Sequence, residues 1–394
     1  MALDPDAALA RVLAAVPTPA VAYLPLEQCL GLVLAEDALA VADLPPFDRA
    51  MMDGYAVLLA DAGTTVIALT EIAAGDGAVR AALAPGQAWP IMTGAPVPAG
   101  VEAVVPFEQT TRSGDQVVLP PRIRARANIA ARASECTAGQ PWARAGAIVT
   151  PMTLAAAIGV GNATLGVHPR PQIAVLTTGS ELVSEPSRSG QIRDSNGPML
   201  VALLHEAGLT ATRQSVGDDA DALARHLEAA ADTDVVVLSG GVSAGTHDEV
   251  PGVLRRLGAE IIFHHVAQKP GKPLLVAKRG RQLIFALPGN PLAAHLCACR
   301  YVLPAVRKLS GLPHHAATGR AILSAPLPAN GDRIWFVPAR VAAGAVTPLP
   351  PVSSADLVQP HQADAYLRLD AGAPAQPAGT EIAFTRIGMH AWAS

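Results

Sequence analysis

The spacing of apolar positions changes twice along the chain, and these changes divide it into three predicted parts. Residues 1–170 open with an amphipathic helix, expected at 5–16, and continue as an elongated region into which a β-rich module at about 46–138 is inserted. Residues 171–310 alternate short apolar runs with amphipathic stretches, whereas residues 311–394 return to short apolar runs separated by Pro and Ala. The pattern therefore predicts a chain of the class α/β plus β.

The middle part has the rhythm of a doubly wound, mostly parallel α/β sheet. Val235–Leu238 is apolar at every position, as expected for a strand that is buried on both faces. The predicted strands are 173–176, 210–216, 235–238, 260–266, 274–277 and 283–287. The predicted helices are 199–207, 220–231, 250–257 and 291–306. The part before this domain is expected to combine the β-rich module with a helical and extended linker region, and the part after it to form a small β-barrel or sandwich.

Glycine-containing turns lie at the ends of these predicted strands and carry most of the candidate chemistry. Right-handed crossovers bring the loops that follow parallel strands to one edge of the sheet, where ligands bind. The turns are Thr178-Gly179-Ser-Glu181, Ser239-Gly240-Gly241-Val-Ser243 with Asp248, Lys269-Pro-Gly-Lys272 and Pro288-Gly289-Asn290-Pro291. Backbone amides, two ammonium groups and two carboxylates suit a phosphate or another oxyanion together with Mg²⁺.

Composition narrows the class of protein. The chain has 394 residues, of which 50% are hydrophobic and 16% charged, so it has ample apolar material for several cores. A net charge of −4 argues against a large nucleic-acid interface. Only four of the 29 basic residues Lys and Arg are lysines, yet two of them, Lys269 and Lys272, share one turn. This clustering favours a site that needs a compact ammonium group, over a chance grouping on a surface turn.

Neither a targeting segment nor a membrane span is expected. The first residues lack the basic start and apolar core of a signal peptide, and the uncharged run 145–167 contains Pro, Asn and several Gly. Cys29 and Cys136 are isolated, and His295-Leu-Cys-Ala-Cys299 is expected to pack rather than to bind metal. These features predict a cytoplasmic protein without structural disulfides.

The complete set of motifs closely resembles the molybdopterin molybdenumtransferase family (MoeA), whose eukaryotic relative is the E domain of gephyrin. The matching motifs occur in the family's order and cover most of the chain. They are Pro46-Phe-Asp-Arg-Ala-Met-Met-Asp53-Gly-Tyr-Ala56, Met92-Thr93-Gly-Ala-Pro-Val-Pro98, Thr178-Gly-Ser-Glu-Leu182, Ser239-Gly-Gly-Val-Ser-Ala-Gly245 with Asp248, Lys269-Pro-Gly-Lys-Pro273 and Leu287-Pro-Gly-Asn-Pro291.

The resemblance implies a reaction and an assembly. Molybdate is joined to the dithiolene of adenylated molybdopterin with Mg²⁺, which releases AMP and gives active molybdenum cofactor. It also implies an elongated homodimer in which the α/β domain of one subunit faces the β module of the other. Molybdopterin adenylyltransferase and downstream molybdoenzymes or their chaperones are candidate partners, and neither nucleic acid nor a membrane is expected.

The resemblance also implies roles for individual residues. Asp53 and Thr93 would line the site from the N-terminal module, and Glu181 and Asp248 would hold Mg²⁺ or orient the adenylate. Asp219, or the preceding Asp218, is a further acidic candidate for the metal, although a helix N-cap explains it equally well. Lys269 and Lys272 would attract molybdate. The residues implied to cradle the pterin and phosphate are Thr178, Gly179, Ser239, Gly240, Gly241, Ser243, Pro288, Gly289, Asn290 and Pro291.

Two departures from the family pattern concern peripheral contacts. Where the family usually has Gly-Glu-Asp, the chain has Ala133-Ser134-Glu135, so Glu135 would replace the aspartate with a longer arm. The C-terminal Gly-Ser turn is Ser353-Ser354, and Ser354 with Arg333 and Arg340 would help hold molybdate.

Two other functions are compatible with parts of the pattern. A molybdopterin adenylyltransferase shares the α/β domain and its turns, but it needs neither the N-terminal module nor the C-terminal β domain. A non-catalytic molybdopterin-binding or scaffold protein is the second alternative, and retention of the acidic residues and both lysines disfavours it.

Overall fold

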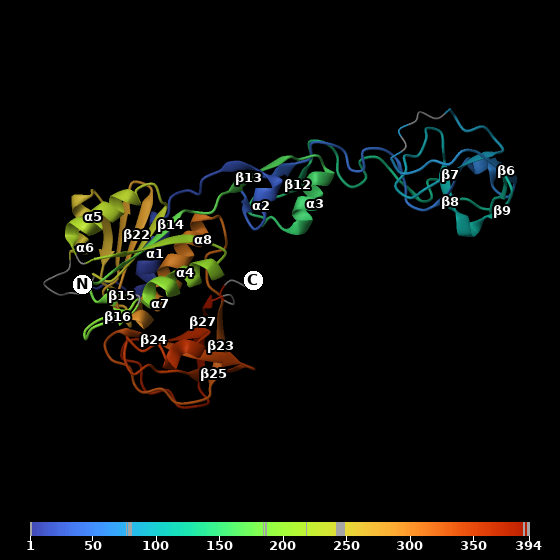
Figure 1. The fold of residues 1–394 in the computed structure, drawn as a ribbon. Coiled ribbons are helices and arrows are strands. Elements are labelled where there is room, and N and C mark those ends of the chain that lie inside the picture. Colours follow the sequence, from blue (N-terminus) through green and yellow to red (C-terminus); the bar gives the residue numbers. More distant parts are fainter. Residues whose placement is uncertain are drawn as a thin grey trace. The chain divides into compact units, whose positions relative to one another are not determined.

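The computed structural model describes residues 2–75, 77, 81–183, 185, 187–217, 219–241, 249–388 and 391. The chain forms two compact units, one from residues 1–22 with 168–394 and the other from residues 23–167 (Figure 1). The expected N-terminal region 1–170 is thus divided near residue 22. The reason is helix α1 (Pro5–Ala15), which buries Ala8 and Val12 completely in the core of the α/β domain. Asp4 caps this helix by accepting hydrogen bonds from two backbone N–H groups of its first turn.

A mixed sheet forms the centre of the first unit, in the strand order β17-β14-β18-β22-β21-β19. The strands are β14 (Ile173–Thr178), β17 (Ala211–Val216), β18 (Val235–Ser239), β19 (Glu260–His264), β21 (Leu275–Arg279) and β22 (Gln282–Leu287). Pairings from β17 to β22 are parallel, whereas β21 pairs antiparallel with both β22 and β19. A short turn joins β21 to β22, and this explains why they pair antiparallel, because two parallel strands need a longer crossover connection.

Helices cover both faces of this sheet (Figure 1). Alternate strand residues enter opposite cores: Val175 and Val237 pack on one side, Leu176 and Leu238 on the other. The first core includes α1, and the second contains α5 (Ala220–Ala229) and α6 (Val250–Arg256). The remaining helical segments of the first core are α4 (Asn196–Glu206), α7 (Pro291–Cys297), the π-helical turn η3 (Ala298–Val302) and α8 (Leu303–Leu309). The single helix predicted at 291–306 is therefore interrupted by a π-helical turn.

The C-terminal part is a closed barrel, which decides between the predicted barrel and sandwich. Its strand order is β24-β25-β23-β27-β26, and an additional pairing of β24 with β26 closes the ring. The strands are β23 (Thr318–Leu323), β24 (Ile334–Ala342), β25 (Ala345–Pro348), β26 (Ala365–Leu369) and β27 (Glu381–Arg386). A two-residue strand from the α/β part, β20 (Gln268–Lys269), pairs in parallel with the start of β24. This pairing joins the barrel to the turn that carries the two lysines.

The second unit contains two regions with separate cores. One is a β module in the strand order β8-β5-β7-β6-β10-β9, and the other packs around helix α3 (Pro151–Gly159). The module strands are β5 (Gly54–Val57), β6 (Thr65–Ala68), β7 (Gln87–Ile91), β8 (Ala103–Pro106), β9 (Thr111–Ser113) and β10 (Gln116–Val118). Short strands link and extend these regions: β1 (Ala22–Pro25), β2 (Val33–Leu34), β3 (Ala38–Leu39), β4 (Arg49–Ala50), β11 (Ile129–Ala130), β12 (Pro141–Ala143) and β13 (Thr164–His168).

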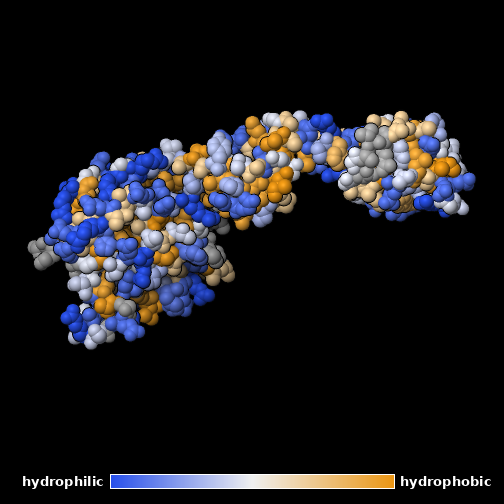
Figure 2. Space-filling model, turned by 45° about the horizontal axis from the view of Figure 1, so that its top comes forward, coloured by the Kyte–Doolittle hydropathy of each residue, from blue (hydrophilic) through white to orange (hydrophobic). Residues whose placement is uncertain are grey.

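The face of the molecule in Figure 2 carries hydrophobic and hydrophilic residues interspersed on each unit. Within the described ranges, every helix is too short or too polar to span a lipid bilayer. The four cysteines are buried and free, in agreement with the prediction that none forms a disulfide.

Candidate active site

The glycine turns after β14, β18 and β22 meet at one edge of the central sheet. The Thr178 hydroxyl donates to the Ser239 carbonyl oxygen (3.4 Å), and the Gly240 N–H donates to the Leu287 carbonyl oxygen (3.1 Å). Gly240 has a φ of +103°, and a Cβ there would lie 2.5 Å from the Thr178 carbonyl oxygen. Only glycine fits this position, so Gly240 lets the two turns approach one another.

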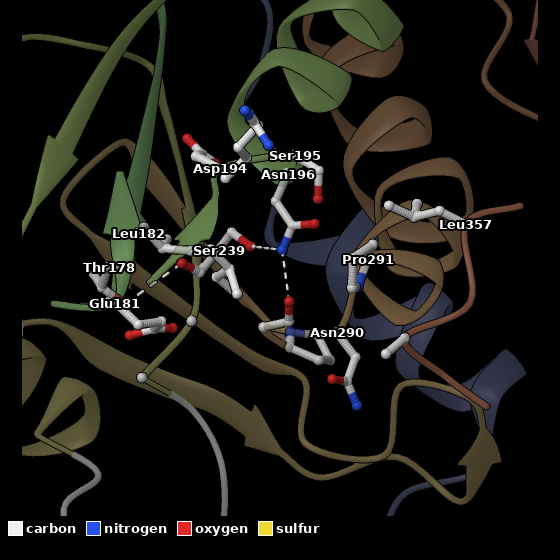
Figure 3. Close-up of a pocket in the computed structure, with 18 of the residues that line it drawn as sticks. Thr178, Glu181, Leu182, Asp194, Ser195, Asn196, Ser239, Asn290, Pro291 and Leu357 are labelled. Atoms are coloured by element: carbon white, nitrogen blue, oxygen red, sulfur yellow. Dashed lines mark hydrogen bonds between the residues drawn. The ribbon is translucent and has the colours of Figure 1, made fainter. Parts of the chain in front are cut away.

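A cavity of about 590 Å³ opens above these turns (Figure 3). Glu181 lies at its rim and folds over Gly179, where a Cβ would lie 2.7 Å from either carboxylate oxygen. Nine of the ten predicted pterin- and phosphate-binding residues are in its wall: Thr178, Gly179, Ser239, Gly240, Gly241, Pro288, Gly289, Asn290 and Pro291. The structure thus brings together residues that are up to 113 positions apart in the chain.

Asn196 is a part of this cavity that the sequence analysis missed. Its Nδ2 donates to the Ser239 hydroxyl (2.8 Å) and to the Gly289 carbonyl oxygen (2.7 Å), so it joins two of the turns (Figure 3). The Gly289 carbonyl oxygen can only accept, which fixes the orientation of the amide. Its Oδ1 is buried and has no hydrogen-bond partner among the described residues.

Asp194 precedes Asn196 and organises the start of helix α4. Its carboxylate accepts hydrogen bonds from the Thr177 hydroxyl (3.0 Å) and the Gly197 N–H (2.9 Å), and it pairs with Arg213 at 3.2 Å. The signal in the sequence was Asp194-Ser-Asn-Gly197 directly before a helix, since Asp, Ser and Asn are typical of helix starts. The prediction placed the helix start three residues later, at Met199, and so overlooked them.

A second cavity of about 350 Å³ adjoins the first and is cationic. Lys269, Lys272 and Arg333 line it, together with Ser354. Both cavities share Pro273, Pro288 and Asn290 in their walls. The predicted lysines and the barrel residues Arg333 and Ser354 therefore meet beside the glycine turns, whereas Arg340 lines neither cavity.

Two contacts hold the walls of the cationic cavity. The Lys269 ammonium lies 4.7 Å from the centre of the Trp335 ring, a cation–π contact. The Asn290 Nδ2 donates to the Ser354 hydroxyl at 2.7 Å, which links a turn of the α/β domain to the barrel.

The barrel loop that carries Ser354 is folded around Asp356. Its carboxylate accepts hydrogen bonds from the backbone N–H groups of Val352 (3.1 Å), Val358 (3.0 Å) and Gln359 (3.2 Å). These bonds, led by that from Val352, hold the pKa of Asp356 below its usual value. A single acidic residue thus shapes one wall of both cavities, because Pro351, Ser354 and Leu357 line one or the other.

Three predicted site residues belong to the second compact unit. Asp53 accepts hydrogen bonds from the Thr93 backbone N–H (2.7 Å) and hydroxyl (2.8 Å), and the pKa of Asp53 is lowered by these bonds, the backbone one first. Asp53 and Thr93, which come from two separate motifs, thus form one hydrogen-bonded pair within the module. Glu135 is half-exposed and pairs with Arg49 at 3.3 Å.

The acidic residues predicted to bind metal have different surroundings. Asp219 lines neither cavity and caps helix α5, accepting from the Ala222 N–H at 2.7 Å, as its alternative interpretation expected. Asp248 and the predicted Ser243 lie outside the described residues. No group of three or more His, Cys, Asp or Glu side chains among the described residues is arranged to hold a metal ion. Mg²⁺ commonly uses one or two carboxylates completed by substrate phosphate, and Glu181 fits this donor set.

Cys299 is buried and His295 is partly buried, and the two side chains contact each other. One turn of helix separates them, and the Cys299 Sγ lies 3.7 Å from the His295 Nε2. Burial lowers the pKa of His295 to about 4 and raises that of Cys299, so both stay neutral near pH 7. The pair therefore packs within the core.

Comparisons with known proteins show the family of this chain. The family model described as the MoeA N-terminal region (domain I and II) matches residues 3–161, and that of a probable molybdopterin binding domain matches residues 174–308. Molybdopterin molybdenumtransferase 2 of Mycobacterium tuberculosis is 36% identical over 323 residues, which cover 77% of this chain and 80% of that protein. A molybdopterin molybdenumtransferase of Staphylococcus aureus is 35% identical over 296 residues, covering 73% and 71%.

Solved structures show the same fold over nearly the whole chain. Two structures of the molybdopterin biosynthesis MoeA protein from Pyrococcus horikoshii have TM-scores of 0.84 and 0.76, each with 26% identity. They cover 98% of this chain and 99% and 100% of their own chains. Sequence, fold and cavity residues lead to one conclusion: this chain belongs to the molybdopterin molybdenumtransferase (MoeA) family.

Proposed function

We propose that this chain inserts molybdenum into molybdopterin, with molybdate and adenylated molybdopterin as substrates and AMP as a product. One observation carries the proposal. The cavity above the glycine turns and the cationic cavity share a wall, so an anionic heterocyclic substrate and a small oxyanion would be held side by side. The curated relatives named above are molybdopterin molybdenumtransferases.

Charge explains why the two cavities differ. Molybdate is a dianion and the phosphoanhydride of the second substrate is also negative, so their approach in a partly dehydrated site is opposed by repulsion. Lys269, Lys272 and Arg333 supply three cations in the smaller cavity. The larger cavity supplies glycine backbone amides and the carboxylates of Glu181 and Asp194, which suit phosphate oxygens, a bridging cation and the N–H groups of a heterocycle.

Mg²⁺ fits the acidic side of this arrangement. We propose Glu181 as one ligand and Asp248 as a second, with Asp53 and Thr93 as a further polar pair that serves the site. When bound, Mg²⁺ would neutralise phosphate charge and help AMP to leave. Lys269 and Lys272 hold the oxyanion, and Asn196 keeps two phosphate-binding turns at a fixed spacing.

A turnover assay tests this function. Purified protein is mixed with adenylated molybdopterin, Mg²⁺ and molybdate, and both AMP release and reconstitution of an apo-molybdoenzyme are measured. The proposal expects AMP release that requires molybdate and Mg²⁺ together. Pterin binding without AMP release would instead favour the scaffold alternative.

The adenylyltransferase alternative makes a different prediction for the same assay. Such an enzyme would consume ATP and unmodified molybdopterin without any need for molybdate. The match of residues 3–161 to the MoeA N-terminal region disfavours it, because the adenylyl transfer needs only the α/β domain.

The homodimer is also part of the proposal. Helix α3 supports it, because Met152 is 77% exposed and Ile158 is 67% exposed on a helix that carries no charged residue. Sedimentation velocity would test this, and a monomer at micromolar concentration would contradict it.

A further inference from the structure

The turn that presents the two lysines alternates buried and exposed residues. Gln268, Pro270 and Gly271 are buried, whereas Lys269 and Lys272 are exposed and line the cationic cavity. A turn can hold two ammonium groups at a fixed separation only if its buried side is anchored. The anchor is therefore what decides where the two charges lie.

A chain of polar contacts forms this anchor. The Tyr301 hydroxyl donates to the Gln268 Oε1 at 2.6 Å, and the Gln268 Nε2 donates to the Gly271 carbonyl oxygen at 3.4 Å. The same Nε2 lies 3.5 Å from the Cys297 Sγ. Because the Gly271 carbonyl oxygen can only accept, the orientation of the amide is fixed. These contacts run from Tyr301, in the helical turn η3, to the main chain of the turn that carries Lys269 and Lys272.

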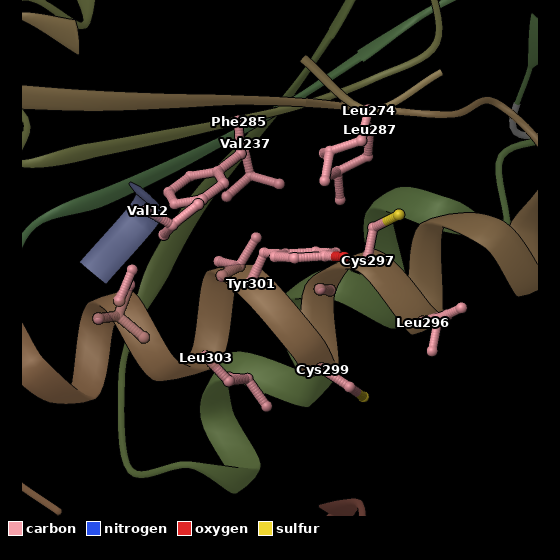
Figure 4. Close-up of a cluster of buried hydrophobic side chains, with 14 of the residues drawn as sticks. Val12, Val237, Leu274, Phe285, Leu287, Leu296, Cys297, Cys299, Tyr301 and Leu303 are labelled. Atoms are coloured by element: carbon pink, nitrogen blue, oxygen red, sulfur yellow. The ribbon is translucent and has the colours of Figure 1, made fainter. Parts of the chain in front are cut away.

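All of these side chains lie inside the hydrophobic core. Gln268, Cys297 and Tyr301 are each 0% exposed. In Figure 4 the Tyr301 side chain reaches through the cluster with its hydroxyl end next to Cys297, below Leu274 and Leu287. Tyr301 belongs to the π-helical turn η3, and such turns are rare and frequent at functional sites.

Gly271 sits directly on this anchor. Its φ is +89°, and a Cβ would lie 2.7 Å from the Cys297 Sγ and 2.8 Å from the Gln268 Nε2. The turn thus rests on helix α7 without an intervening side chain. A shift of the Gln268 amide would be passed directly to the main chain between the two lysines.

Stability alone does not account for a polar chain in this place. Replacing both partners of a buried hydrogen bond by apolar groups of similar shape is often nearly neutral for folding. The contacts do, however, fix the orientation of the Gln268 amide, on which the main chain of the turn rests.

We propose that Gln268 and Tyr301 are positioning residues of the cationic cavity, which act through Gly271 to set where Lys269 and Lys272 present their ammonium groups. The oxyanion affinity of the cavity depends on this placement. The identity of the oxyanion as molybdate rests on the proposed function, whereas the anchoring of the turn does not.

The decisive variant replaces both partners, Gln268→Leu with Tyr301→Phe. We expect only a modest fall in the unfolding midpoint, because the bond between Gln268 and Tyr301 loses both partners at once and the Cys297 thiol, 3.8 Å from the Gly271 carbonyl oxygen, remains as a donor to it. We expect the Kd and KM for molybdate to rise roughly tenfold, because small displacements of binding groups weaken a site strongly. The kcat and the KM for adenylated molybdopterin should stay unchanged.

Gln282→Leu is the matched control. Gln282 is also a buried glutamine, 4% exposed, and its Nε2 donates to the Ala230 carbonyl oxygen at 2.6 Å and to that of Thr233 at 2.9 Å. It lies at the start of β22, while the cavity residues follow the end of that strand. This variant should lose stability and keep the molybdate Kd of the unchanged chain.

The experiment is titration of the full chain with sodium molybdate by calorimetry, combined with hydrogen exchange of the backbone segment 266–275. The double variant should bind molybdate more weakly and exchange faster in this segment, and the control should do neither. An unchanged Kd in the double variant, or an equal loss in the control, would overturn the inference. If the unchanged chain binds no molybdate, the proposed function fails. Hydrogen exchange then decides the inference by itself, and an unchanged exchange rate of segment 266–275 in the double variant would overturn it.

Discussion

The side chain of Asn290 donates a hydrogen bond of 2.7 Å to the hydroxyl of Ser354. Asn290 belongs to a turn of the α/β domain and Ser354 to the barrel, and both line the cationic cavity. The contact closes one side of the space in which we expect molybdate. The chain has Ser353-Ser354 where the family has a Gly-Ser turn, so the second serine is retained, and its hydroxyl makes this contact.

Replacement of Ser354 by alanine should therefore weaken molybdate binding with little effect on folding. The Ser354 hydroxyl accepts from Asn290 and so keeps its own proton to donate to an oxyanion in the cavity, and one such hydrogen bond contributes roughly 0.5–1.5 kcal/mol, which corresponds to about a two- to tenfold rise in the KM for molybdate. Steady-state kinetics with molybdate varied would measure it. Ser324→Ala is the control, because its hydroxyl pairs with Thr347 elsewhere in the barrel. A KM equal in both variants would refute a role for Ser354.

Removal of the Lys272 charge should reduce oxyanion binding strongly. We expect Lys272→Gln to raise the KM for molybdate about tenfold or more, since a charge-assisted contact contributes roughly 1.5–3 kcal/mol. The effect should shrink as salt concentration rises. Lys278→Gln is a matched control on β21, because Lys278 lines neither cavity. Equal KM values in the two variants at low salt would exclude Lys272 from the site.

Asn196 should matter for folding as well as for binding. Asn196→Ala removes the donor to Ser239 and Gly289, so we expect a loss of about 2–3 kcal/mol in the free energy of unfolding. Urea unfolding would measure it. Ser195→Ala is the control, because Ser195 is the N-cap residue of the same helix but its side chain makes no capping hydrogen bond. Its free energy of unfolding should stay within about 0.5 kcal/mol of that of the unchanged chain. A loss in Ser195→Ala as large as that in Asn196→Ala would contradict the role of Asn196 in joining the two turns.

Ala133 stands at a backbone position that favours glycine. Its φ is +61°, in the left-handed region where a Cβ is strained. We expect Ala133→Gly to stabilise the chain by about 0.5–1 kcal/mol, as relief of strain exceeds the added freedom of the unfolded chain. Thermal unfolding is the measurement. Ala131→Gly, two residues earlier and not among the positive-φ positions, should destabilise instead.

The Asp53 carboxylate should respond to the loss of the Thr93 hydroxyl. In the folded chain the pKa of Asp53 is lowered from 3.8, so its contribution to stability is present above the unfolded pKa and is lost as pH falls through the folded value. Thr93→Val keeps the backbone N–H bond and removes the hydroxyl, which should raise the pKa of Asp53 toward 3.8. A carbon NMR titration would show this. Thr110→Val, whose hydroxyl bonds to Phe107, should leave the pKa of Asp53 unaltered.

The alternation of strands and helices in the middle part was predictable because each element buries a simple apolar pattern. Val235–Leu238, for example, is buried at every position. Helix α3 was missed because its residues are apolar on all sides, with Met152 exposed and Ala157 buried, so no period marks it. The antiparallel placement of β21 was not specified either, since a buried run such as Leu275–Ala277 fits a strand of either direction.

For the site, the glycine turns and lysines were recognisable from their spacing, whereas Asn196 and Gln268 were not. An isolated Asn at a helix start is usually a cap, and a Gln before Lys-Pro-Gly-Lys has no distinguishing neighbour. Their roles depend on partners that are far away in the sequence: Gly289 for Asn196 and Tyr301 for Gln268. Such pairs arise only when the chain has folded.

The pairing of β20 with β24 affects how the barrel can be exchanged between relatives. Lys269 is in register with Trp335, and the Ile334 N–H donates to the Ala267 carbonyl oxygen at 3.2 Å. A chimera that cuts the chain near residue 311 would place a foreign strand beside residues 267–269. Activity in such a hybrid should therefore require that both strands come from the same parent, so the barrel and the lysine turn are inherited as one unit.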